Sequence, residues 1–66
     1  MILADKITEE RKKNGWSQEE LANQLGVSRQ AVSKWENGTS DPSTSNLFAL
    51  AKLYGISVEE LLKEVE

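Results

Sequence analysis

Apolar residues recur along this chain at the spacing of amphipathic helices, and no segment alternates apolar and polar residues as a strand does. The clearest stripe contains Leu47, Leu50, Ala51 and Tyr54, which lie one helical turn apart on a single face. The pattern predicts five helices, at about residues 3–14, 18–25, 29–37, 44–54 and 58–64. Helices this short are marginal alone in water, so the pattern indicates an all-α domain with one shared core.

Local capping signals support these boundaries. Ser17 precedes the second helix, and Glu20 three residues later completes a capping box. Ser57 and Glu60 predict a second capping box at the fifth helix. Serine caps are also expected at Ser28 and Ser43, and glycines that can end helices stand at Gly15, Gly26, Gly38 and Gly55.

One apolar core is expected to hold these helices together. Trp16 and Trp35 are of the type that stacks on bases in single-strand binders, but their positions favour the core. The expected core residues are Leu3, Ile7, Trp16, Leu21, Leu25, Val27, Val32, Trp35, Leu47, Leu50, Ala51, Tyr54, Ile56 and Leu61.

Residues 18–37 combine two short helices with a tight turn at Gly26, and the small Ala22 allows the helices to approach closely. This is the helix-turn-helix pattern, in which the second helix is presented to the major groove of DNA. If Val32 and Trp35 face the core, four polar residues remain at or near the outer face of that helix. They are Arg29, Gln30, Ser33 and Lys34.

The segment SQEELANQLGVSRQAVSKWENG closely resembles the Cro/repressor-type (Xre-type) helix-turn-helix family of bacterial and phage regulators. The resemblance continues through RKKNGWSQEELA and NLFALAKLYGISVEELL, so it covers nearly the whole chain. It implies a compact five-helix, lambda-repressor-like DNA-binding domain over residues 1–66, cytoplasmic and without a cofactor. It further implies a transcriptional regulator, expected to be a repressor, that binds double-stranded DNA as a homodimer on a near-palindromic operator.

The resemblance also implies roles for individual residues. The residues implied to read bases are Arg29, Gln30, Ser33 and Lys34. The residues implied to contact phosphate are Gln18, Ser28, Asn37, Gly38 and Thr39. Arg29 can bridge O6 and N7 of guanine, and Gln30 can bridge N6 and N7 of adenine. Both lie in the first turn of the third helix, which usually meets base edges. Lys34 has the alternative of contacting phosphate alone, and Gln18 is also implied to brace the third helix.

Two charged positions on the first helix affect its packing. Arg11 and Glu36 match a partly buried ion pair of some family members, and two separate surface groups are the alternative. Glu10 departs from the family, which often has an apolar residue there, and leaves the first helix a thin apolar stripe. Lys12 and Lys13 lie in the last turn of the first helix, where their positive charges are expected to interact favourably with the helix dipole rather than to contact DNA.

The net charge of −3 is distributed unevenly. Residues 1–35 hold six basic and five acidic groups, whereas residues 36–66 hold two basic and six acidic groups. Because salt screens charges beyond roughly 8–10 Å, local patches decide what a surface attracts. The acidic total therefore does not exclude DNA binding, but it predicts weak non-specific affinity.

Composition excludes several other classes of function. The chain has no cysteine and no histidine, so it lacks disulfides, thiolate metal sites and the commonest general base. No glycine-rich phosphate loop is present, and we expect neither an enzyme, a metal site nor a small-molecule ligand. No apolar run approaches the roughly 20 residues of a membrane span.

A second apolar patch is a hypothesis for the dimer interface. Its residues, Phe48, Leu53, Val58, Leu62 and Val65, lie off the main stripes, and partial burial is the alternative. A different function also stays open, because an antitoxin-like or adaptor module on the same fold would bind a protein through the acidic C-terminal half.

Overall fold

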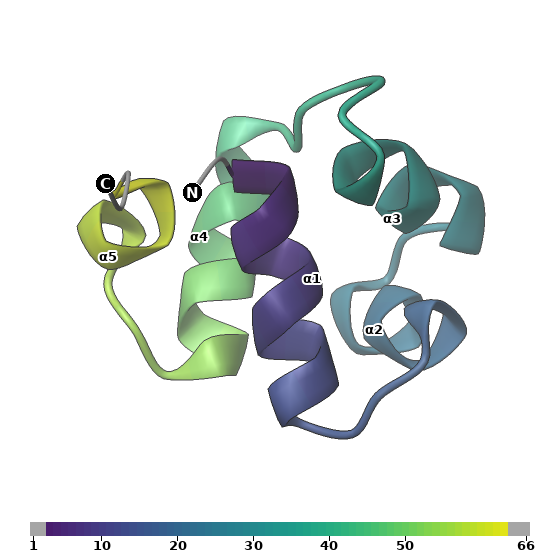
Figure 1. Ribbon diagram of the computed structural model, residues 1–66, viewed down its shortest axis with the longest axis horizontal. Coiled ribbons are helices and arrows are strands. Elements are labelled where there is room, and N and C mark those ends of the chain that lie inside the picture. The colour runs from purple at the N-terminus through teal and green to yellow at the C-terminus, as the bar shows by residue number, and fades with distance from the viewer. Residues whose placement is uncertain (1–2, 64–66) are drawn as a thin grey trace.

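The computed structural model describes residues 3–63, which form five helices and no strand. Their bounds are α1 Leu3–Lys13, α2 Gln18–Leu25, α3 Arg29–Glu36, α4 Thr44–Tyr54 and α5 Val58–Leu62. In Figure 1, α2 and α3 lie on one side of α1 and α5 lies on the other side. The predicted all-α fold is confirmed. The fifth helix is shorter than predicted, because Lys63 already has extended backbone, with φ of −67° and ψ of 130°.

The helix starts follow the predicted serine caps. Ser17 Oγ accepts a hydrogen bond from the Glu20 amide at 3.0 Å, and the Ser17 amide donates to Glu20 Oε1 at 2.8 Å, so this capping box is complete. At α5, Ser57 Oγ accepts from the Glu60 amide at 3.0 Å. Between these two described residues, the Ser57 amide donates no hydrogen bond to the Glu60 side chain. The prediction of a complete second capping box was therefore wrong, although its serine cap is present. Glu60 is exposed there, and its carboxylate can be solvated by water instead.

The turn between α2 and α3 is a Schellman motif. The Val27 amide donates to the Ala22 carbonyl at 3.0 Å, and the Gly26 amide donates to the Asn23 carbonyl at 3.3 Å. Gly26 has a φ of +73°, a left-handed conformation in which a side chain would be strained. The motif satisfies two of the last four carbonyls of α2 and sets the direction in which the chain leaves it toward α3.

The core lies where all five helices meet. Every residue expected in the core is either buried or packed against the buried cluster. Ala22 is 2% exposed, which is consistent with its role as a small residue between packed helices. Trp35 is 5% exposed, and Trp16 stacks on Tyr54 with ring centroids 6.4 Å apart. Both tryptophans therefore serve packing, as their positions predicted.

Glu10 is buried on α1 even though it carries a charge. Its residue is 7% exposed, and its Oε2 lies 3.5 Å from Lys6 Nζ and 3.4 Å from Lys13 Nζ. The two lysines offset the charge within the same helix. The Tyr54 hydroxyl also donates to the Ile7 carbonyl of α1 at 3.1 Å. The thin stripe of α1 is thus supplemented by polar contacts.

Candidate nucleic-acid interface

The outer face of α3 is polar, as the burial pattern predicted. Val32 and Trp35 are buried on the inner face. Arg29, Gln30 and Lys34 are exposed, and Ser33 is half-buried. The helix begins at exposed Ser28, whose Oγ accepts a hydrogen bond from the Ala31 amide at 3.1 Å.

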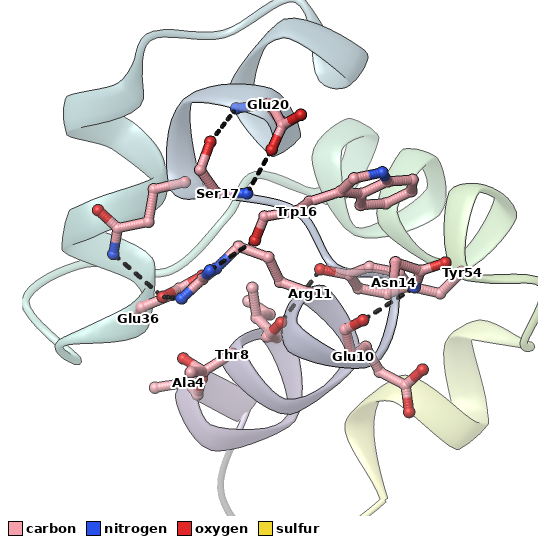
Figure 2. Close-up of polar contacts among 12 residues, drawn as sticks. Ala4, Thr8, Glu10, Arg11, Asn14, Trp16, Ser17, Glu20, Glu36 and Tyr54 are labelled. Atoms are coloured by element: carbon pink, nitrogen blue, oxygen red, sulfur yellow. Dashed lines mark hydrogen bonds and ion pairs between the residues drawn. The ribbon is translucent and has the colours of Figure 1, made fainter.

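An ion pair fixes α3 against α1 (Figure 2). Arg11 Nε lies 2.7 Å from Glu36 Oε2, and a second guanidinium nitrogen lies 3.0 Å from Glu36 Oε1. The remaining guanidinium nitrogen donates to the Trp16 carbonyl at 2.8 Å, in the segment that leads into α2. The side chains of Arg11 and Glu36 are 13% and 7% exposed. The implied buried ion pair is confirmed, and the alternative of two separate surface groups is wrong.

Gln18 joins this cluster from the start of α2. Its Nε2 donates to Glu36 Oε1 at 3.0 Å, so one carboxylate connects α1, α2 and α3. The implied bracing role of Gln18 is therefore present in the geometry, whereas its phosphate contact stays a prediction. The structure adds a partner that the sequence pattern did not identify, the Trp16 carbonyl. A main-chain acceptor has no signature in the sequence.

The cluster keeps Glu36 ionised. Burial by itself would raise the pKa of this carboxyl, but hydrogen bonds from Arg11 and Gln18 oppose burial and leave the pKa below its ordinary value. The hydrogen bond to Glu36 correspondingly raises the pKa of Arg11. Charged hydrogen bonds are stronger than neutral ones, and the bidentate contact of Arg11 with Glu36 is also geometrically specific, so the cluster supports α3.

The same pairing changes the charge of the α3 surface. Glu36 is the one acid of α3, and Arg11 neutralises it, so the exposed charges of the helix are Arg29 and Lys34. The acidic residues Glu59 and Glu60 lie on α5, on the opposite flank of the molecule (Figure 1). The exposed charges of α3 itself are therefore positive on a chain with a net charge of −3, while the exposed acids nearest in the fold include Glu19 and Glu20 on the neighbouring α2.

The loop after α3 is tightly hydrogen-bonded. The Thr39 amide donates to the Lys34 carbonyl at 2.9 Å, and the Gly38 amide donates to the Trp35 carbonyl at 3.4 Å. Asn37 Oδ1 accepts from both the amide and the hydroxyl of Thr39, with a distance of 2.9 Å to the amide. Asn37, Gly38 and Thr39 are all exposed. Their implied contacts with phosphate stay a prediction.

The residues of the hypothetical dimer patch differ in exposure. Phe48 of α4 is 60% exposed and Leu62 of α5 is 47% exposed. Leu53 and Val58 are half-buried and pack against the core, whereas Val65 lies outside the described residues. Phe48 and Leu62 are therefore the large apolar side chains of this set with most surface to offer a partner.

Residues 3–63 also bear on two other kinds of site, a metal site and a membrane span. No group of three or more acidic, cysteine or histidine residues could hold a metal ion in this range. None of the helices described is long and apolar enough to cross a membrane.

Comparisons with known proteins place these features in a family. The family described as helix-turn-helix matches residues 7–61. The HTH-type transcriptional activator BcrR of Enterococcus faecalis is 39% identical over 66 residues, which cover 100% of this chain and 32% of BcrR. An HTH-type transcriptional regulator of Methanocaldococcus jannaschii, MJ0272, is 37% identical over 59 residues, or 89% of each chain.

A solved structure agrees with the sequence comparison. The P22 c2 repressor in complex with synthetic operator 9T matches with a TM-score of 0.89 and 36% identity, over 96% of both chains. This agreement extends across the helices and the turn described above. The chain therefore belongs to the helix-turn-helix family, of the Cro/repressor (Xre) type that the sequence resembles.

Proposed function

We propose that this chain is the DNA-binding domain of a sequence-specific transcriptional regulator, acting as a repressor. The observation that carries the proposal is the outer face of α3. It presents Arg29, Gln30 and Lys34 to solvent while Val32 and Trp35 anchor the helix in the core. The operator complex of the P22 c2 repressor, 36% identical over most of both chains, supports the assignment by likeness.

The proposed mode of reading follows from side-chain chemistry. Arg29 bonds both acceptors of a guanine, and Gln30 bonds the acceptor and donor of an adenine in the major groove. Ser33 and Lys34, one turn further on, bond a neighbouring base or phosphate. Each bidentate contact is worth about 1–3 kcal/mol of discrimination between bases. The Arg11–Glu36 pair contributes indirectly, because it fixes the helix on which these residues stand.

Two copies are proposed to bind together, with apolar contacts that include Phe48 and Leu62. Recognition helices of such dimers enter successive major grooves about 34 Å apart. The described part of one copy measures 29 × 24 × 23 Å between its outermost Cα positions. The width of one copy is thus of the order of one helical turn of DNA, which leaves room for one copy on each half-site. A near-palindromic operator is the expected consequence of a twofold axis between them.

In vitro selection from random duplex DNA tests this proposal, with the stoichiometry of the bound complex measured by native mass spectrometry. We expect one enriched motif, two related half-sites and two protein copies per duplex. Lys52→Ala on α4 removes the same charge as Arg29→Ala and serves as the matched control. The control should keep the motif and Arg29→Ala should relax it. Selection that enriches no motif with the unaltered protein would refute the proposal, and a pull-down resistant to nuclease would then favour a protein-binding module.

A further inference from the structure

The loop after α3 has few hydrogen-bond donors left for a ligand. The Gly38 amide bonds the Trp35 carbonyl, and the Thr39 amide bonds the Lys34 carbonyl, so these two main-chain donors close the end of the helix. The Thr39 hydroxyl donates to Asn37 Oδ1 and keeps only lone pairs for other partners. Phosphate oxygens accept hydrogen bonds, so they need a donor. Within residues 37–39, the Asn37 side-chain NH₂ is the group for which the described structure shows no acceptor.

The orientation of the Asn37 side chain follows from the same contacts. The Thr39 amide lies 2.9 Å from one end of the Asn37 carboxamide, and a main-chain amide can only donate. The end that faces it must be the oxygen, because an NH₂ group in that place would set two donors against each other. The Nδ2 end consequently points away from Thr39. Asn37 is exposed and follows directly after the last residue of α3.

We propose that Thr39 is a positioning residue for DNA binding, which holds the Asn37 carboxamide with Nδ2 turned toward a phosphate. This inference rests on the proposed function and adds to it separate roles for two residues of the loop. Asn37 makes the contact, and Thr39 acts through Asn37 by fixing one side-chain conformation before DNA arrives. A donor that is already oriented loses less conformational freedom on binding, which is the source of the expected gain in affinity.

A double-mutant cycle on the duplex recovered by selection tests the inference. Asn37→Ala is expected to weaken binding about tenfold per monomer, as for a hydrogen bond to a charged group. Thr39→Val removes the hydroxyl but keeps the amide, so a smaller loss of about threefold is expected. Thr39→Ser restores the hydroxyl and should bind like the unaltered protein. When Asn37 is already alanine, Thr39→Val should cause no further loss.

Two further measurements separate positioning from a general structural effect. The thermal unfolding midpoints of the Thr39 variants should equal that of the unaltered protein, because the residue is exposed. Replacing the contacted phosphate by a neutral methylphosphonate should weaken binding of the unaltered protein and leave Asn37→Ala unaffected. Asn23→Ala, an exposed asparagine on α2, is the matched control and should bind normally.

The outcomes of the cycle separate failure of the inference from failure of the proposed function. If Thr39→Val reduces DNA affinity by the same factor in the unaltered protein and in Asn37→Ala, Thr39 contacts DNA directly and the inference is overturned. Normal binding by Asn37→Ala would overturn it as well, while leaving the proposed function intact. Failure of the unaltered protein to bind any selected duplex would instead refute the proposed function itself.

Discussion

Replacing Glu36 with alanine should lower the free energy of unfolding by about 3 kcal/mol, because it leaves the Arg11 guanidinium without its carboxylate. Glu36 accepts two hydrogen bonds from Arg11 and one from Gln18, and its side chain is 7% exposed. Removing one partner of a buried ion pair typically costs about 3–5 kcal/mol. The lower end applies here, because Arg11 keeps its bond to the Trp16 carbonyl and its side chain is 13% exposed.

The size of this loss matters in so short a chain. At roughly 0.05–0.15 kcal/mol per residue, a domain of this length is stable by about 3–10 kcal/mol. Glu36→Ala should therefore remove about a third or more of the total, although Glu36 is not among the residues predicted to read bases. An exposed salt bridge would contribute only about 0–1 kcal/mol.

Urea unfolding followed by tryptophan fluorescence measures the difference, with the free energy extrapolated linearly to water. Glu9→Ala removes an exposed carboxylate from α1 and should change stability by no more than about 0.5 kcal/mol. Combining Glu36→Leu with Arg11→Met should recover most of the loss, because no buried charge is then left unpaired. If Glu36→Ala costs no more than Glu9→Ala, the cluster does not support α3 and the reasoning is refuted.

Substitutions at three positions give four further expected outcomes. Folding lowers the pKa of Glu36, so the unaltered protein should be more stable than Glu36→Gln by a constant amount near neutral pH. Unfolding measured across an acid titration should show this difference in stability shrinking as the pH falls below 4.5. Tyr54→Phe loses the bond to the Ile7 carbonyl and about 1 kcal/mol. Burial raises the pKa of Tyr54, so the unaltered protein should also lose stability above pH 10.0, and Tyr54→Phe should lose less in alkaline unfolding curves. Gly26→Ala meets no atom within 4 Å, so calorimetry should show only the backbone cost of about 1–2 kcal/mol.

Local signals explain why most of the fold could be predicted from the sequence. A serine cap, a terminal glycine and a stripe of apolar residues act within one or two turns of chain, and each is visible in order. The capping box at Ser17 and the polar outer face of α3 followed from such signals. The second capping box was predicted wrongly, because the exposed side chain of Glu60 accepts no hydrogen bond from the Ser57 amide. The helix α5 also ends earlier than predicted, at Leu62.

Contacts between distant residues explain what could not be predicted from the residues alone. Arg11 and Glu36 are 25 positions apart, so only family resemblance suggested their pairing. The lysine partners of Glu10 are local, three and four positions away on α1, but its burial depends on how α1 packs against the other helices. The Asn37–Thr39 contact joins near neighbours, but it depends on the left-handed Gly38 between them, which has a φ of +80°. Side-chain orientation in such loops requires the backbone.

The most direct test of DNA reading by α3 compares the unaltered protein and Arg29→Ala on the selected operator and on each single base-pair variant of it. For the unaltered protein, we expect one guanine in each half-site whose replacement weakens binding by about 1–3 kcal/mol. For Arg29→Ala, replacing that guanine should cause no further loss, while the penalties at other positions remain. Identical profiles for the two proteins, with every penalty retained in Arg29→Ala, would contradict the claim that α3 reads the operator through Arg29.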